Sequence, residues 1–322
     1  MTEFAICPYC KDALDDSKPI IVLNNEKVHS ECAVGAGDIT TGLDGSVVSV
    51  PGVNVLLMGP PGTGKTHVLR TLIDAGIKDI FCIFTEPGME VMADTRVASE
   101  AYRKALKENH IHWKYVAPAQ SSWAQFQTSV RDALTFDIGT LQKRVAVDKQ
   151  NQFLNVLQAC ENFKCDRCKQ EFGNVDDWGV DRALVFDSLS GLNVMLLGMA
   201  AGSKPVITQP EWGQAMKMEE AFINRLSLGL QCHFIMCAHV DRQTDMLSGG
   251  VKQMPSALGQ KLPPVISRFF SDVILTVKEG DKFTWTTSSS TSDTKARNII
   301  NSSKLEPSFV PIIKQWRANN AI

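Results

Sequence analysis

Residues 53–66 read VNVLLMGPPGTGKT, an apolar run followed by a glycine-rich turn that ends in lysine and threonine. The turn matches the pattern G-x-x-x-x-G-K-[ST], which in its usual context follows a strand and opens a helix. Small residues at these positions let backbone N–H groups point inward around phosphate oxygens. The segment therefore predicts a nucleotide-binding P-loop; the alternative is a glycine turn with a surface lysine.

The P-loop pattern assigns chemistry to individual residues. We expect Lys65 to neutralise the β- and γ-phosphate oxygens and the Thr66 hydroxyl to bind Mg²⁺. The residues expected to contact the nucleotide are Gly59, Gly62, Thr63, Gly64, Lys65, Thr66 and His67. ATP and Mg²⁺ are accordingly the predicted cofactors, and ATP hydrolysis is the predicted reaction.

Beyond the P-loop, short apolar runs alternate with longer periodic segments. The runs expected to form buried strands are residues 79–85, 113–116, 183–186 and 234–238. Residues 211–230 place apolar side chains on one stripe, as in a helix that packs on a sheet. This alternation predicts an α/β fold with a mostly parallel sheet between helices.

Hydrolysis also needs a carboxylate that orients the metal. The apolar run at residues 183–186 ends in Asp187, which places this acid at the carboxyl edge of a parallel sheet, where such sheets bind ligands. We assign Asp187 to the Mg²⁺ shell. The alternative is that Asp187 is only the N-cap of the following helix.

The spacing of a second acid resembles that in RecA-type recombinases. In that family the strand next to the P-loop ends in a catalytic glutamate, and Glu86 of the segment IFCIFTEPG lies 21 residues after Lys65. A typical AAA+ ATPase keeps its glutamate beside the metal-binding aspartate, whereas here Ser188 follows Asp187. The resemblance covers roughly residues 50–312. It implies a RecA-like P-loop core and is nearest to the phage RecA-like ATPases linked to single-strand annealing.

The same resemblance implies roles for three further residues. His239 ends the run HFIMCAH, where RecA relatives carry a polar residue that senses the γ-phosphate. Lys295 and Arg297 resemble the paired basic residues that RecA subunits insert into a neighbour's ATP site, which implies a homo-oligomer, either a ring or a filament. Simpler interpretations remain open: Glu86 as a solvated acid at a helix start, His239 as a hydrogen-bonded strand end, and the basic pair as a solvated hairpin edge.

Two long segments fall where RecA-type proteins hold single-stranded DNA. Residues 198–213 and 242–264 are rich in glycine, proline and amide side chains. Their candidate contacts to phosphates and bases are Lys204, Trp212, Arg242, Lys252 and Lys261. We expect both segments to be functional loops, because long loops in compact domains usually are.

The N-terminal segment carries a metal-ligand pattern. Cys7 and Cys10 form one C-x-x-C pair, and His29 and Cys32 follow after 18 residues. Four soft ligands at this spacing predict a closed structural Zn²⁺ site, which resembles half of a LIM domain or another treble-clef finger. Such a site would fold a module too short to be stable alone. The alternative is unmetallated thiols.

The other cysteines are less informative. Cys165 and Cys168 lie in CDRC after Cys160, but a zinc site there would need His110 or His112 from elsewhere in the fold, and free cysteines are the simpler interpretation. The three cysteines expected in the core, because they lie in apolar runs, are Cys82, Cys232 and Cys237.

Composition and these motifs suggest how the chain is organised. It has 322 residues, 44% hydrophobic and 21% charged, with a net charge of −2, so a nucleic-acid contact would have to be a local patch. The expected parts are a zinc-finger module at 1–33, a linker at 34–50 and an ATPase core at 51–322 with a Cys-containing insertion at 141–180. Neither a leader nor an apolar run of roughly 20 residues is apparent, so we expect a cytoplasmic protein, in the host cytoplasm if phage-encoded, without a membrane partner.

Two functions fit this pattern. The first is an ATPase that acts on single-stranded DNA in recombination, annealing or replication. The second is a nucleotide-switched interaction protein, such as a helicase loader, that docks a protein partner through the zinc finger. The sequence does not distinguish annealing from strand exchange or loading, nor does it identify what the finger binds.

Overall fold

The computed structural model describes residues 6–14, 20–23, 26–29, 32, 40–41, 47–48, 50–116, 152–201, 207–244 and 250–320. The central element is a seven-stranded sheet in the order β13-β12-β5-β9-β8-β6-β7. Its strands in chain order are β5 (Asn54–Met58), β6 (Asp79–Phe84), β7 (Ile111–Tyr115), β8 (Arg182–Asp187), β9 (His233–Ala238), β12 (Asp272–Glu279) and β13 (Lys282–Thr286). All neighbours are parallel except β13, which runs antiparallel to β12.

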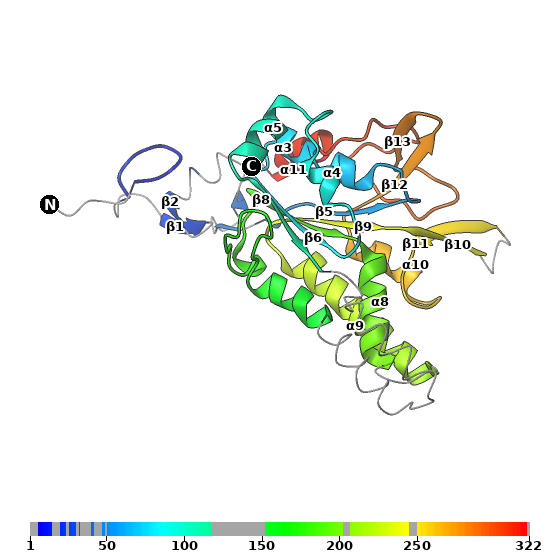
Figure 1. Cartoon of the computed structure of the whole chain (residues 1–322). Helices are drawn as coiled ribbons and strands as arrows, with labels where there is room; N and C mark the ends of the chain where they lie inside the picture. Colours follow the sequence, from blue (N-terminus) through cyan, green and yellow to red (C-terminus); the bar gives the residue numbers. More distant parts are fainter. Residues whose placement is uncertain are drawn as a thin grey trace.

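Helices cover both faces of this sheet (Figure 1). One face carries α2 (Lys65–Val68), α3 (Thr71–Asp74), α4 (Met89–Ala93), α5 (Glu100–Lys107) and α11 (Val310–Asn320). The other face carries α8 (Leu189–Ala201) and α9 (Gln209–Gly229). The shorter helices are α10 (Pro263–Ile266) and the 3₁₀ turns η1 (Val175–Asp177) and η2 (Ser267–Phe269). The predicted α/β fold with a mostly parallel sheet is therefore confirmed.

The apolar runs form strands because both of their faces are buried. In β5, Leu56 and Met58 pack into the core on one side of the sheet, while Val55 and Leu57 pack into the core on the other. Successive side chains of a strand point to opposite faces, so a strand covered on both sides must be apolar throughout. The three cysteines predicted in the core are buried at 2% exposure or less: Cys82, Cys232 and Cys237.

The two segments predicted to be DNA-binding loops have more regular structure than expected. Residues 198–201 end α8, residues 202–206 with Lys204 lie outside the described part, and α9 already begins at Gln209. This early start follows from a capping box, in which the Thr208 N–H donates to the Glu211 carboxylate at 2.9 Å. The second segment forms an antiparallel hairpin of β10 (Val240–Thr244) and β11 (Val251–Pro255), so the loop prediction was wrong there.

Both edge strands of the sheet are partly covered. At one edge, the Asp166 N–H donates to Trp113 O of β7 at 2.7 Å, and Tyr115 N–H donates to the Asp166 carboxylate at 2.8 Å. At the other edge, Trp285 of β13 exchanges backbone hydrogen bonds of 2.9 Å with Leu305. Chain segments that are not strands of the sheet therefore take up backbone groups that an edge strand would leave open.

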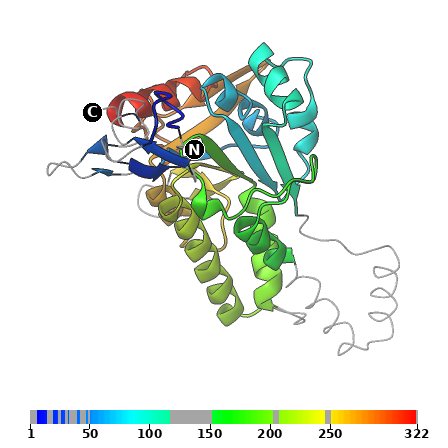
Figure 2. The ribbon, with the colours of Figure 1, turned by 90° about the vertical axis from the view of Figure 1, so that its left-hand side faces the viewer.

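The N-terminal residues form small pieces of sheet apart from the central one. The strands β1 (Ile20–Leu23) and β2 (Glu26–His29) pair antiparallel, as do β3 (Thr40–Thr41) and β4 (Val47–Val48). Figures 1 and 2 place β1 and β2 at the side of the molecule away from the β10–β11 hairpin. Among the described residues, no helix has both the length and the apolar character needed to cross a bilayer.

A buried carboxyl joins α9 to the segment after the hairpin. The Glu219 side chain is fully buried, and its Oε2 accepts a 2.9 Å hydrogen bond from Leu258 N–H. Burial disfavours the charged carboxylate and raises the pKa of Glu219 to about 8. The folded state therefore holds this proton at pH values where the unfolded chain has lost it.

We expect this proton to make stability fall as the pH rises. Below the pKa that Glu219 has in the unfolded chain, its carboxyl is protonated in both states. Between that value and about 8, it is protonated only in the folded state, so the free energy of unfolding falls by at most roughly 1.4 kcal/mol per pH unit. Glu219→Gln, which cannot ionise, should flatten the dependence between pH 5 and 8 in urea unfolding. Glu220→Gln, at the partly exposed neighbouring position, is the control and should leave the dependence as in the wild type.

Candidate nucleotide-binding site

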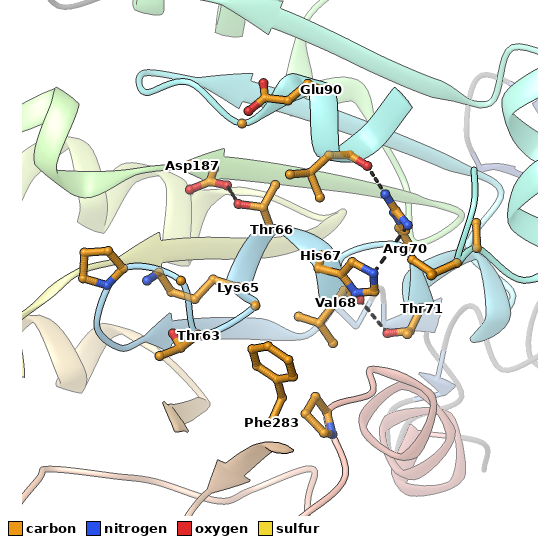
Figure 3. Close-up of a pocket in the computed structure, with 18 of the residues that line it drawn as sticks. Thr63, Lys65, Thr66, His67, Val68, Arg70, Thr71, Glu90, Asp187 and Phe283 are labelled. Atoms are coloured by element: carbon orange, nitrogen blue, oxygen red, sulfur yellow. Dashed lines mark hydrogen bonds between the residues drawn. The ribbon is translucent and has the colours of Figure 1, made fainter. Parts of the chain in front are cut away.

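A cleft of about 870 Å³ opens at the carboxyl ends of the parallel strands. The P-loop follows β5 and leads into α2, and Figure 3 shows Thr66 directed toward Asp187 and the Lys65 side chain lying along the P-loop. The lining includes the acids and the histidine predicted from the sequence: Glu86, Asp187 and His239. The sheet therefore brings into one cleft residues that lie as far apart in the chain as Pro61 and His239.

Thr66 and Asp187 are adjacent, as a Mg²⁺ site requires. The Thr66 hydroxyl donates to Asp187 Oδ2 at 2.6 Å (Figure 3). Asp187 is largely buried at the end of β8, and this burial raises its pKa, while the hydrogen bond from Thr66 and the charge of Lys65 act in the opposite direction. A hydroxyl and a carboxylate oxygen at this separation are hard oxygen ligands that fit Mg²⁺ bound together with nucleotide phosphates.

The Lys65 ammonium rests on the P-loop itself. It donates to Gly59 O at 2.7 Å and Pro60 O at 2.9 Å, and burial lowers its pKa. Gly62 and Gly64 have φ values of 75° and 85°, which glycine adopts without strain. At Gly59 a Cβ would lie 2.0 Å from Thr276 Oγ1, so only glycine fits beside β12. Phosphate oxygens of a bound nucleotide can replace Gly59 O and Pro60 O as acceptors of the Lys65 hydrogen bonds.

Glu86 and His239 face each other across the cleft. His239 Nε2 lies 3.1 Å from Glu86 Oε2, and His239 Nδ1 lies 3.5 Å from Lys65 Nζ. The hydrogen bond with His239 is the main cause that lowers the pKa of Glu86, which keeps this carboxylate charged. The geometry follows from strand order, because β9 lies between β5 and β8 and so carries His239 between the P-loop and the acids. This arrangement can hold the Glu86 carboxylate in a position to accept a proton from a water molecule in the cleft.

The remaining P-loop residues have structural partners. The Thr63 hydroxyl lies 2.6 Å from that of Thr276, which fastens the loop to β12. His67 lines the cleft next to Arg70 at 3.5 Å, and burial together with the Arg70 charge lowers its pKa. Each of these residues therefore lies at the site where the sequence placed it.

Sequence reasoning missed one aromatic side chain of the cleft. Phe283 of β13 lies beside the P-loop, and its ring would be 3.4 Å from a Cβ at Gly64 (Figure 3). The side chain is 43% exposed, which is unusual for phenylalanine and leaves a ring open to the cleft. No motif marks this position, because the pairing of β12 with β5 is what brings β13 toward the P-loop.

Lys295 and Arg297 do not join the cleft of their own chain. Lys295 pairs with Val273 near the start of β12, and its ammonium donates to Phe270 O at 2.7 Å. Arg297 N–H donates to the Asp272 carboxylate at 2.7 Å, and the Arg297 residue is exposed. Since β12 is parallel to β5, the start of β12 lies at the amino ends of the strands, whereas the P-loop lies at their carboxyl ends. Any role in hydrolysis would therefore have to be in a neighbouring subunit.

The N-terminal cysteines and histidine come together as the sequence predicted. The ligand atoms of Cys7, Cys10, His29 and Cys32 all lie within 4.8 Å of one another. Cys10 Sγ is 3.3 Å from His29 Nδ1, at the end of β2. Three sulfurs and one imidazole nitrogen at these separations are a donor set that fits Zn²⁺. The cluster could thus form a small metal-binding module.

Comparison with known proteins assigns the family. The sequence model of a family described as "AAA domain" matches residues 52–298, which include the P-loop, Glu86 and Asp187. No curated protein matches the chain. The match covers most of the chain and all seven strands of the central sheet. The chain therefore belongs to the AAA domain family of P-loop ATPases.

Proposed function

We propose that this protein is a RecA-like ATPase that acts on single-stranded DNA in recombination, annealing or replication. The observation that carries the proposal is the course of the chain after β9. His239, which contacts both Glu86 and Lys65, is followed at once by the β10–β11 hairpin. Ser256 N–H donates to His239 O at 2.8 Å, so the base of the hairpin is bonded to the histidine. A change at the γ-phosphate would therefore reach the hairpin through one residue.

The proposed reaction follows from the cleft. Thr66 and Asp187 would hold Mg²⁺ with the phosphates, and Lys65 would leave the P-loop carbonyls to bind phosphate oxygens. Glu86 would orient and polarise the attacking water, and His239 would hold the Glu86 carboxylate until the nucleotide is bound. A homo-oligomer, in ring or filament form, would complete the site with Lys295 and Arg297 of a neighbour.

The hairpin offers a surface for phosphates. Figure 1 shows β10 and β11 extending beyond the central sheet. Arg242 on β10 is exposed, while Lys252 on β11 is partly buried with Asp293 at 3.7 Å. Val251, which precedes Lys252 in β11 and pairs with Thr244, is 54% exposed. A narrow ribbon with a cation and an apolar side chain suits contact with a flexible strand better than with a broad protein surface.

We expect single-stranded DNA to raise the ATPase rate and Arg242→Ala to weaken DNA binding. Loss of one phosphate contact should reduce the slope of log K against log salt by about 0.7, the value per contact for a single strand. The measurement is fluorescence anisotropy with an oligonucleotide over a salt series, together with the ATPase rate with and without DNA. Arg103→Ala, which removes an exposed arginine from α5, is the matched control.

A rate that DNA leaves unchanged would favour the second candidate, a nucleotide-switched interaction protein such as a helicase loader. The observation in its favour is the N-terminal Cys/His cluster, a compact module that a protein partner could recognise. In that case, nucleotide would control the binding of a protein partner to the N-terminal module, and DNA affinity would not depend on Arg242.

A further inference from the structure

A second Cys/His cluster lies at the β7 edge of the sheet. His112 of β7 and the turn residues Cys165 and Cys168 place their ligand atoms within 4.8 Å of one another. Cys168 Sγ is 3.6 Å from His112 Nδ1. His112 and Cys165 are fully buried, and Cys168 is partly exposed. The cluster is thus closed toward the protein and open on one side to solvent.

The turn that holds these cysteines has the same backbone hydrogen bonds as the N-terminal C-x-x-C turn. In each turn, the N–H of the first cysteine donates to the carbonyl oxygen five residues later. The lysine that follows the second cysteine has a positive φ, and its N–H donates to the carbonyl oxygen of the first cysteine. The bonds are Cys7 N–H to Asp12 O at 2.8 Å and Lys11 N–H to Cys7 O at 3.0 Å, and Cys165 N–H to Gln170 O at 2.9 Å and Lys169 N–H to Cys165 O at 3.0 Å. The φ values are 66° for Lys11 and 62° for Lys169. Positive φ is uncommon for lysine, so its recurrence at the same place marks one specific turn.

Backbone N–H groups of the second turn point at sulfur. The N–H groups of Arg167 and Cys168 lie 3.3 and 3.5 Å from Cys165 Sγ. Such donors favour a sulfur that carries negative charge, as a metal-bound thiolate does. The turn is therefore prepared for a thiolate rather than for a neutral thiol.

The histidine is held as a metal ligand would be. Phe81 stacks on His112 with ring centroids 4.7 Å apart, and Phe172 lies 4.1 Å away, which fixes the ring plane. Nδ1 faces Cys168, whereas Nε2 faces Asp79 Oδ1 at 3.8 Å and has no hydrogen bond within the described part of the chain. Metal-bound histidines commonly direct their second nitrogen toward a carboxylate. Asp79 is itself fixed by His110 Nδ1 at 2.7 Å.

We propose that His112 Nδ1, Cys165 Sγ and Cys168 Sγ bind a zinc ion, a site separate from the N-terminal cluster and from the nucleotide cleft. Two thiolates and an imidazole suit Zn²⁺ among the common divalent metals, and the two thiol protons leave to solvent when the metal binds. The fourth ligand is water on the exposed side of Cys168. The ion fastens the segment around the turn to β7, where Asp166 already covers backbone groups of that strand.

The test is the zinc content of the full-length protein and of matched variants. We expect about two zinc ions per chain in the wild type and about one in Cys168→Ala or Cys7→Ser. Cys160→Ser, at a partly exposed cysteine outside both clusters, should keep about two. Co²⁺ reconstitution of Cys7→Ser should still give the absorption of thiolate-bound Co²⁺. An unchanged zinc content in Cys168→Ala, or a single ion in the wild type that Cys7→Ser removes, would overturn the proposal.

A measurement on the wild type alone covers the case in which Cys168→Ala does not fold. Thiol alkylation followed by peptide mapping should show Cys165 and Cys168 protected until a chelator removes the metal, after which their labelling rates should rise by at least tenfold. Cys160 should label at the same rate in both conditions. Labelling of Cys165 and Cys168 that is independent of the chelator, or a disulfide between them in anaerobically prepared protein, would contradict a zinc site.

Discussion

Glu86→Gln should bind nucleotide as the wild type does and lose hydrolysis. Glutamine keeps the length of the side chain and can still contact His239, but it cannot accept a proton from water. General-base catalysis is typically worth about 10² to 10⁴ in rate, so we expect kcat to fall by that factor. Binding should persist because the phosphate contacts come from the P-loop, and the metal contacts from Thr66 and Asp187, which remain 2.6 Å apart.

Lys65→Ala provides the contrast. This variant removes the ammonium that now lies on Gly59 O and Pro60 O, so it should lose turnover because the phosphates lose their main positive charge. Binding of a fluorescent nucleotide and single-turnover hydrolysis separate the two variants. A Glu86→Gln protein that hydrolyses ATP at the normal rate would show that another group polarises the water.

Arg297→Ala should abolish the rise in ATPase rate that accompanies assembly. Lys295 and Arg297 lie at the amino ends of the strands, whereas the cleft lies at their carboxyl ends. Arg297 can therefore reach a nucleotide only if subunits meet head to tail. Stabilisation of the phosphoryl group by such a residue in trans is worth about 10³ to 10⁵ in rate. Lys295→Ala should act in the same direction, although it also breaks the bond to Phe270 O.

Mixing inactive subunits tests this role directly. Lys65→Ala chains keep the basic pair, and Arg297→Ala chains keep the P-loop lysine, so a mixture should recover activity at the mixed interfaces. Arg268→Ala is the matched control, because Arg268 is an exposed arginine of η2 just before β12. Activity should rise with protein concentration in the wild type and in Arg268→Ala. A failure to recover activity at every mixing ratio would rule out the trans role.

The sequence predicts β6, β7, β8 and β9 because each is an apolar run, but the runs it marks do not include β12 or β13. Where such a run leads into an acid, the acid lies at the carboxyl ends of the strands, where the cleft opens. Asp187 and Glu86 are examples, and their local patterns suffice. Strand order is different, since it depends on long-range packing that no local pattern records. The sequence therefore could not show that β9 brings His239 next to both Lys65 and Glu86, nor that β13 brings Phe283 beside Gly64.

Two other features escaped for related reasons. The β10–β11 hairpin has polar side chains along most of its length, and without an apolar alternation it has the sequence of a loop. His112 was one of two candidates to complete a cluster with Cys165 and Cys168, and the pairing of β6 with β7 together with the turn at 165–168 makes the choice. His110 lies outside the cluster, because its Nδ1 forms a hydrogen bond with the Asp79 carboxylate.

The covered edges of the sheet restrict how copies of this protein can associate. Backbone groups of β7 are bonded to Asp166, and β13 exchanges hydrogen bonds with Leu305, so a foreign strand would have to displace the contact at whichever edge it extends. In the proposed homo-oligomer, subunits would then meet through side chains, whose contacts can be remade within a catalytic cycle. Continuous backbone pairing between chains would be harder to undo, which would hinder the proposed oligomer if nucleotide hydrolysis has to take it apart.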